Sequence, residues 1–184
     1  MNSLHMAHRR HGRHSSYRWN PRPALAGALA GLAGGTAMLV LAALLTMVLN
    51  QERWLQLKLI ASILLGTSAT ATTGFAAGPV LLGVALHLAA SALLGVLFAL
   101  LMRRAAPLPS SMGTPEVAGP LYGLLVWGII YFAIAPLLVP AILTIATASL
   151  LIQHLVYGAI TGLLYSLLAP QSYGQLGGGP VHLE

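Results

Sequence analysis

The hydrophobic positions of the chain gather into four long, nearly uninterrupted stretches. Each has about 20 residues or more, the length at which an α-helix crosses roughly 30 Å of hydrocarbon. None of the stretches carries Asp, Glu, Lys or Arg in its interior. The pattern therefore predicts an all-α membrane protein with four transmembrane helices, over residues 24–49, 79–102, 117–139 and 147–168.

Polar residues and prolines separate this membrane domain from two tails. We expect a basic tail rich in His and Arg over residues 1–23, a transmembrane domain over 24–168 and a flexible tail over 169–184. Pro136 is expected to kink the end of the third helix, because a proline inside a helix removes a hydrogen bond and clashes with the preceding turn.

The connection between the first two stretches holds a short amphipathic segment, residues 54–60. Trp54 and Lys58 stand there beside an apolar face, a composition typical of a short interfacial helix lying at the membrane surface. A re-entrant segment is the alternative, and it would have to be covered by protein. Residues 67–73, rich in Thr, Ser and Ala, are expected to form a loop.

Composition supports a membrane location. Of the 184 residues, 57% are hydrophobic and 7% are charged, whereas soluble domains carry about 25% charged residues. Too few charges are available to build a water-soluble surface, so the lipid bilayer must cover most of it. The chain has no cysteine, which excludes disulfides, thiolate metal sites, iron–sulfur clusters and a cysteine nucleophile.

The basic residues indicate an orientation. The formal net charge is +6, and arginines cluster before the first stretch and directly after the second. Because basic residues in short flanks stay on the inner side, we expect a multi-pass protein of the cell inner (cytoplasmic) membrane with cytoplasmic N- and C-termini. Aromatic residues are not interleaved with the basic tract, so no nucleic-acid partner is expected.

The two halves of the chain resemble each other, which indicates an internal repeat. His87 and Gly95 of the second stretch have the spacing of His154 and Gly162 of the fourth, and an aromatic residue follows each glycine three positions later. Each half is therefore predicted to be one helical hairpin, and the two are related about an axis along the membrane normal.

Small residues recur at spacings of four within these helices, which places them on one helix face. In a membrane such faces let helix backbones approach closely. The residues assigned to helix packing in this way are Gly27, Gly31, Gly35, Ser91, Gly95, Gly158 and Gly162.

These residues resemble a small family of four-helix bacterial and archaeal membrane proteins that has no assigned activity. The shared pattern includes Gly83-x-x-x-His87, Leu-Tyr-Gly-Leu-x-x-Trp over residues 121–127, and His-Leu-Val-Tyr-Gly over 154–158. The resemblance covers about residues 24–168. It implies the four-helix fold and marks the two histidines, and it implies no role for them.

His87 and His154 are the candidate site, because ionisable groups inside a span are costly and often functional. Three interpretations stay open. The histidines could form interhelical hydrogen bonds, with the neighbourhood of Ser91, Tyr131 or Tyr157 as partners. They could be the axial ligands of a haem or of a chlorin magnesium held between the helices. They could line a proton or substrate path, although such paths usually include an intramembrane carboxylate and the spans have none.

No catalytic or metal site is predicted elsewhere. Ser91 and Ser149 lie near histidines in the sequence, but no acid is close enough to orient a triad. The four histidines of the N-terminus are spaced by three and could bind a transition metal, although a basic tail on anionic lipid explains them more simply. They are His5, His8, His11 and His14.

The sequence thus favours a non-enzymatic accessory or structural subunit that packs with other membrane protein subunits or with itself. A bis-histidine electron carrier with haem or another tetrapyrrole is the alternative, and a small transporter is the third hypothesis.

Overall fold

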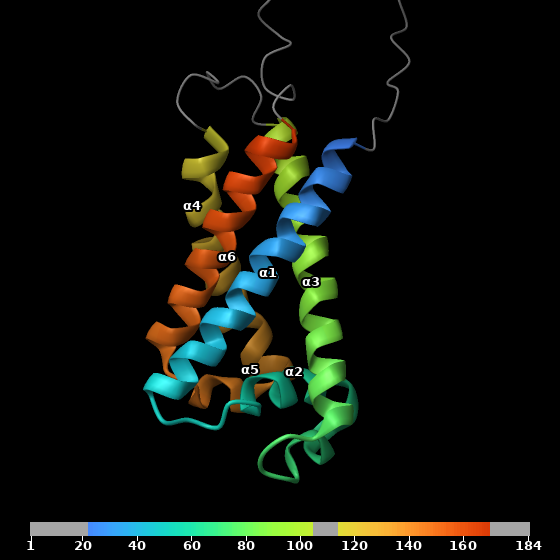
Figure 1. Ribbon diagram of the computed structural model, residues 1–184, viewed down its shortest axis with the longest axis vertical. Coiled ribbons are helices and arrows are strands. Elements are labelled where there is room, and N and C mark those ends of the chain that lie inside the picture. The colour runs from blue at the N-terminus through green and yellow to red at the C-terminus, as the bar shows by residue number, and fades with distance from the viewer. Residues whose placement is uncertain (1–21, 105–113, 170–184) are drawn as a thin grey trace, which may run out of the picture.

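The computed structural model describes residues 22–104 and 114–169 of the chain, and within them every regular element is helical. Four long helical segments run alongside one another (Figure 1). They are α1 (Arg22–Val48), α3 (Ala77–Arg104), α4 (Thr114–Ile129) with its continuation to Leu138, and α6 (Thr147–Leu168). Each is long and apolar enough to cross a membrane. The predicted all-α class and the four spans are confirmed.

The third span is not a regular α-helix throughout. After α4 the chain widens into a π-helical turn, η3 (Ile130–Ile134), and then closes with α5 (Ala135–Leu138). Pro136 lies just beyond this turn, where its missing N–H and its ring disturb the ordinary α-helical bonding. The irregularity expected at Pro136 therefore takes the form of a π-helical turn, a known cause of helix kinks.

Short helices lie at the end of the bundle opposite Arg22. Helix α2 (Leu55–Leu65) crosses this end, close to α5 (Figure 1). It is followed by η1 (Gly66–Thr70), and η4 (Pro140–Thr144) joins α5 to α6. The loop expected over residues 67–73 is in its first part a 3-10 helix, in which the hydroxyls of Ser68 and Thr70 bond carbonyls three residues back.

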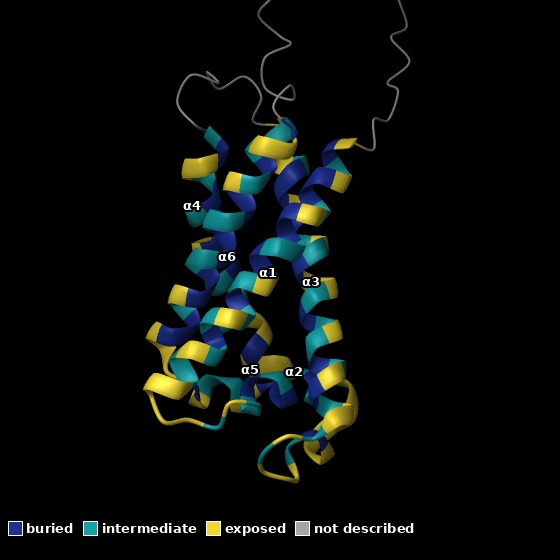
Figure 2. Ribbon diagram, in the orientation of Figure 1, coloured by how far each residue is buried: buried dark blue, intermediate teal, exposed yellow. Residues whose placement is uncertain are grey.

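The order of the helices across the bundle differs from their order in the chain. Helix α1 packs against both α3 and α6, and α4 packs against α6. Helices α3 and α4 are bridged by long side chains: the Tyr122 hydroxyl donates to the Leu94 carbonyl at 2.8 Å, and the Phe98 and Tyr122 rings lie 5.2 Å apart. Buried positions follow these contacts, and exposed positions face outward (Figure 2).

The outward surface is strongly apolar. Phe132 is 71% exposed and Leu137 is 82% exposed, and many leucines of the four spans are similarly uncovered. Water would not tolerate so extensive an apolar surface on a monomer. Lipid is the solvent that matches it, so the chain is a membrane protein.

Glycines bring the helix backbones into direct contact within each hairpin. A Cβ placed on Gly31 would lie 2.8 Å from the Gly95 Cα, and one placed on Gly27 would meet the Gly95 carbonyl. In the second hairpin a Cβ on Gly123 would lie 3.2 Å from the Gly158 Cα, and Gly119 faces Gly162. Larger residues at these positions would force the helices apart.

Candidate functional site

His87 lies buried on α3, where it faces α1. Its Nε2 is 3.1 Å from the Gly35 carbonyl oxygen. A carbonyl only accepts hydrogen bonds, so Nε2 carries the proton and donates, which leaves Nδ1 as the acceptor nitrogen of a neutral ring. A Cβ on Gly35 would lie 2.6 Å from the Ser91 Cβ. Because Gly35 has no side chain, α1 can lie close enough to α3 for the His87 imidazole to reach the Gly35 carbonyl.

His154 is also buried, on α6, but it bonds within its own helix. Its Nδ1 is 2.7 Å from the Leu150 carbonyl, one turn earlier. By the same reasoning Nδ1 donates and Nε2 is the acceptor nitrogen. The two rings thus use opposite nitrogens, one toward a neighbouring helix and one toward its own backbone.

The residues around the histidines form further bonds to the backbone. The Ser91 hydroxyl donates to the His87 carbonyl at 2.7 Å, and the Tyr157 hydroxyl donates to the Ser91 carbonyl at 2.9 Å. The second bond joins α6 to α3 and so connects the two hairpins. The partner expected for His87 is corrected in part: the acceptor lies beside Ser91, but it is Gly35 and not Tyr131 or Tyr157. Tyr131 instead pairs with Thr147 at 3.0 Å.

The helix packing beside His87 bears on the hypothesis that a tetrapyrrole is ligated there. Each ring keeps one acceptor nitrogen, Nδ1 of His87 and Nε2 of His154, so the hydrogen bonds alone leave ligation open. One turn along the helices, Gly31 meets the Ser91 carbonyl and Gly95, so a flat macrocycle would have to separate α1 from α3. Within residues 22–104 and 114–169, no group of three His, Cys, Asp or Glu side chains is placed to hold a metal ion.

A second set of buried polar groups was not expected from the sequence. The Gln56 amide on α2 donates to the Gln153 amide oxygen on α6 at 2.8 Å, and Gln153 donates to the Ser149 hydroxyl at 3.1 Å. All three side chains are buried. The available signal was the position of Gln153 beside His154 inside an apolar span, where an amide needs a partner. The bond fastens α2 to the second hairpin.

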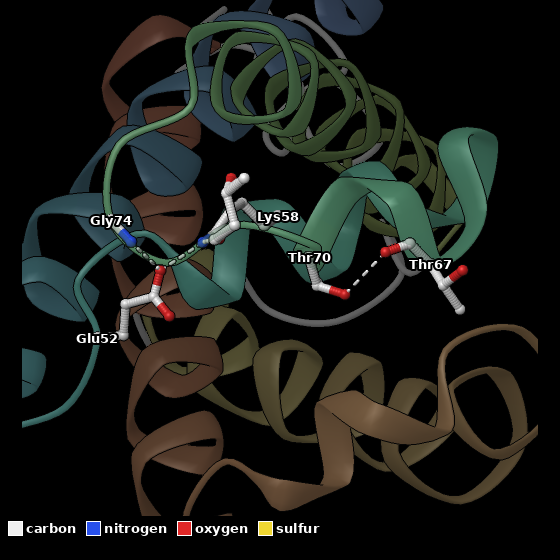
Figure 3. A network of polar contacts seen from close by, with 6 residues as sticks. Glu52, Lys58, Thr67, Thr70 and Gly74 are labelled. Atoms are coloured by element: carbon white, nitrogen blue, oxygen red, sulfur yellow. Dashed lines mark hydrogen bonds and ion pairs between the residues drawn. The ribbon is translucent and has the colours of Figure 1, made fainter.

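An ion pair holds the connection that carries α2 (Figure 3). Lys58, only 1% exposed, contacts the Glu52 carboxylate and donates to the Thr72 carbonyl at 2.6 Å. The same carboxylate oxygen accepts the Gly74 N–H at 3.0 Å. A surface lysine was expected on this amphipathic segment. The side chain is buried instead, because an acid and a carbonyl satisfy its charge.

The remaining sequence hypothesis falls on residues that the structure does not describe. His5, His8, His11 and His14 lie outside the described ranges. The interpretation of these histidines as metal ligands or as part of a lipid-binding tail therefore stays a prediction.

Comparison with known proteins identifies a family without a known role. The model of the Family of unknown function (DUF6789) matches residues 21–175. This confirms the resemblance to a small uncharacterised family. No curated protein and no solved structure matches the chain.

Proposed function

We propose, on the premise that the chain belongs to the DUF6789 family of unknown function, that it is a non-enzymatic structural or accessory subunit of a membrane complex. The observation that carries this proposal is the inward bonding of its intramembrane polar groups. His87, His154 and Tyr157 each bond a backbone carbonyl of the chain itself. The bonds of His87 and Tyr157 join neighbouring helices, and the bond of His154 stays within α6, so all three serve the structure of the chain itself.

The surface left for other molecules supports the same role. One side of the third span exposes Val117, Leu121, Leu125 and Phe132, and this span packs mainly on α6. Between membrane helices, association depends on van der Waals packing and not on an apolar driving force. A rigid apolar ridge is therefore a suitable surface for packing against a second membrane protein or a second copy of the chain.

We also propose the orientation expected from the sequence, with both termini in the cytoplasm and the chain in the inner membrane. The start of α1 and the end of α6, which adjoin the two tails in the sequence, lie at one end of the bundle (Figure 1). Arg103 and Arg104 end α3 at that same end. At the opposite end Lys58 is neutralised by Glu52. This asymmetry supports a cytoplasmic Arg22 end under the positive-inside rule.

The matching glycine contacts support an internal repeat of two hairpins. Gly27 and Gly31 of α1 face α3 as Gly119 and Gly123 of α4 face α6. The same spacing of four residues occurs in both pairs. A duplicated hairpin accounts for both the spacing and the contacts.

Site-specific photo-crosslinking in intact membranes tests the subunit role. A photoreactive residue at Phe132, on the exposed ridge, should give a product whose mass exceeds that of the chain, because a partner packs there. The matched control is Val126, which is 5% exposed on the same span and should crosslink only within the chain. If Phe132 yields no larger product, the chain does not pack against a partner through this ridge.

The two other hypotheses are tested on the same purified protein. A haem protein would show a Soret band that disappears in His87→Ala and in His154→Ala, whereas a colourless folded protein contradicts the cofactor hypothesis. A transporter would need a polar path between the hairpins. There, a Cβ on Gly34 would lie 2.7 Å from the Tyr157 carbonyl oxygen and 2.5 Å from the Thr161 hydroxyl, so this part of the junction is closely packed.

A further inference from the structure

We propose that the hollow beside the end of α1 binds the phosphate of a phospholipid headgroup, with the Arg53 guanidinium as its anchor. This inference goes beyond the subunit role and does not depend on it. It requires only that the four spans lie in a bilayer.

The hollow is shaped by the way α1 ends. The Gln51 N–H bonds the Thr46 carbonyl at 2.9 Å, and Asn50 has a φ of 52°. This is the left-handed ending of a helix, which Asn tolerates better than most residues. The chain therefore turns sharply, and residues 50–54 form a wall with Gly74. The resulting cavity of about 490 Å³ is also lined by Thr46 and Met47.

The charges in the wall favour an anion. Glu52 and Arg53 are the charged residues among those that line the cavity. The Glu52 carboxylate is neutralised by buried Lys58 and also accepts the Gly74 N–H. Arg53 is exposed, and the ion pair in the described part of the chain joins Lys58 to Glu52 and does not include it. One positive charge is left, on a planar group whose donors match phosphate oxygens.

The position of the hollow indicates that the phosphate belongs to a lipid. Trp54 lines the cavity and packs edge-on against Phe75 with ring centres 5.1 Å apart, and tryptophan is enriched at the membrane–water interface. An exposed apolar strip runs along α1 in the two turns before the cavity, and it contains Val40, Leu44 and Met47. A polar hollow at the end of an apolar strip matches a headgroup joined to acyl chains.

Native mass spectrometry of the full chain in mild detergent, titrated with palmitoyl-oleoyl-phosphatidylethanolamine, tests the site. Arg53→Gln should weaken lipid binding by about fivefold, the change that corresponds to about 1 kcal/mol for one basic residue at a lipid surface. Arg53→Lys should retain most of the binding. The matched control is Arg104→Gln, which removes an exposed charge at the other end of the bundle and should leave the affinity unchanged.

Two further probes separate the sources of the phosphate. Palmitoyl-oleoyl-glycerol, which has the acyl chains without phosphate, should not occupy the site. Inorganic phosphate should not displace the phospholipid. Equal losses in Arg53→Gln and Arg104→Gln, equal binding of the phosphate-free lipid, or displacement by inorganic phosphate would each overturn the proposal. Because Arg53 is exposed, circular dichroism should show its variants to be folded.

Discussion

In the α1–α3 hairpin His87 reaches the backbone of the neighbouring helix, whereas in the α4–α6 hairpin His154 turns back to its own helix. The position that corresponds to Gly35 in the second hairpin is Trp127. Gly35 has no side chain beside its carbonyl, whereas Trp127 carries a large indole at the matching position. The two histidines thus have equivalent spacing in the sequence and different hydrogen-bond partners, and the residue at the position of Gly35 differs as well.

The connections of the two hairpins also differ. The first carries α2 and η1, held by the Glu52–Lys58 ion pair. The second has only the short helix η4, which follows the π-helical turn near Pro136. The hairpins thus share their backbone contacts and differ in their polar contacts, and substitutions in matched pairs measure each kind of contact separately.

The largest effect is expected at the backbone contacts. Gly31→Val and Gly123→Val should each lower the free energy of unfolding by about 3 kcal/mol, because the added side chain meets backbone atoms that cannot yield. Gly128→Val is the control, since nothing lies within 4 Å of a Cβ there. Reversible unfolding in mixed micelles measures all three. If only Gly31→Val destabilised the chain, the two hairpins would not be equivalent.

A smaller loss is expected at the first connection. Lys58→Met should cost about 2 kcal/mol, less than the 3–5 kcal/mol typical of a broken buried pair, because Glu52 is 28% exposed and water can reach its carboxylate. Hydrogen exchange should rise in residues 52–74 and stay unchanged in η4. Exposed Arg53, replaced by Met, should leave exchange as it is. If Lys58→Met changed hydrogen exchange equally in both connections, the ion pair would not have a local role.

The hydrogen bond between the side-chain amides of Gln56 and Gln153 should contribute still less to the free energy of unfolding. A double-mutant cycle of Gln56→Leu and Gln153→Leu should give a coupling energy of about 1 kcal/mol, within the range found for hydrogen bonds between membrane helices. A coupling near zero would show that α2 is held by its contacts with α3 alone.

The smallest difference is expected at the histidines. His87→Leu removes a bond between helices and should cost about 0.6 kcal/mol. His154→Leu removes a bond to a carbonyl of its own helix and should cost less, because that bond does not join two elements. The same unfolding titration compares them. A larger loss at His154 would reverse the comparison.

The spans could be predicted from the sequence because lipid requires long apolar helices, and the pattern shows where each begins and ends. The spacing of Gly27 and Gly31 likewise indicated a packing face, since helical periodicity alone places both residues on one side. The partners of the polar groups could not be predicted. Gln56 meets Gln153 across 97 positions of sequence, and such a meeting depends on how the helices are arranged in space.

The same limit applies to Lys58 and to the end of the third span. An amphipathic pattern shows that Lys58 lies opposite apolar residues, but not that Glu52 and the Thr72 carbonyl enclose it. Pro136 predicts that the helix is irregular, but whether the irregularity is a kink or a π-helical turn depends on what packs around it. Features that depend on lipid or on helix periodicity could be predicted from the sequence. Contacts between side chains far apart in the sequence could not.

Each hairpin starts and ends at the same end of the bundle, and this has a consequence for biosynthesis. With both termini in the cytoplasm, as proposed above, the insertion machinery would carry only the two connections across the bilayer. The first contains Glu52, Arg53 and Lys58, and the second, residues 139–146, contains no charged side chain. Because the charges of Glu52 and Lys58 are opposite, the net charge translocated with the first connection is that of a single arginine.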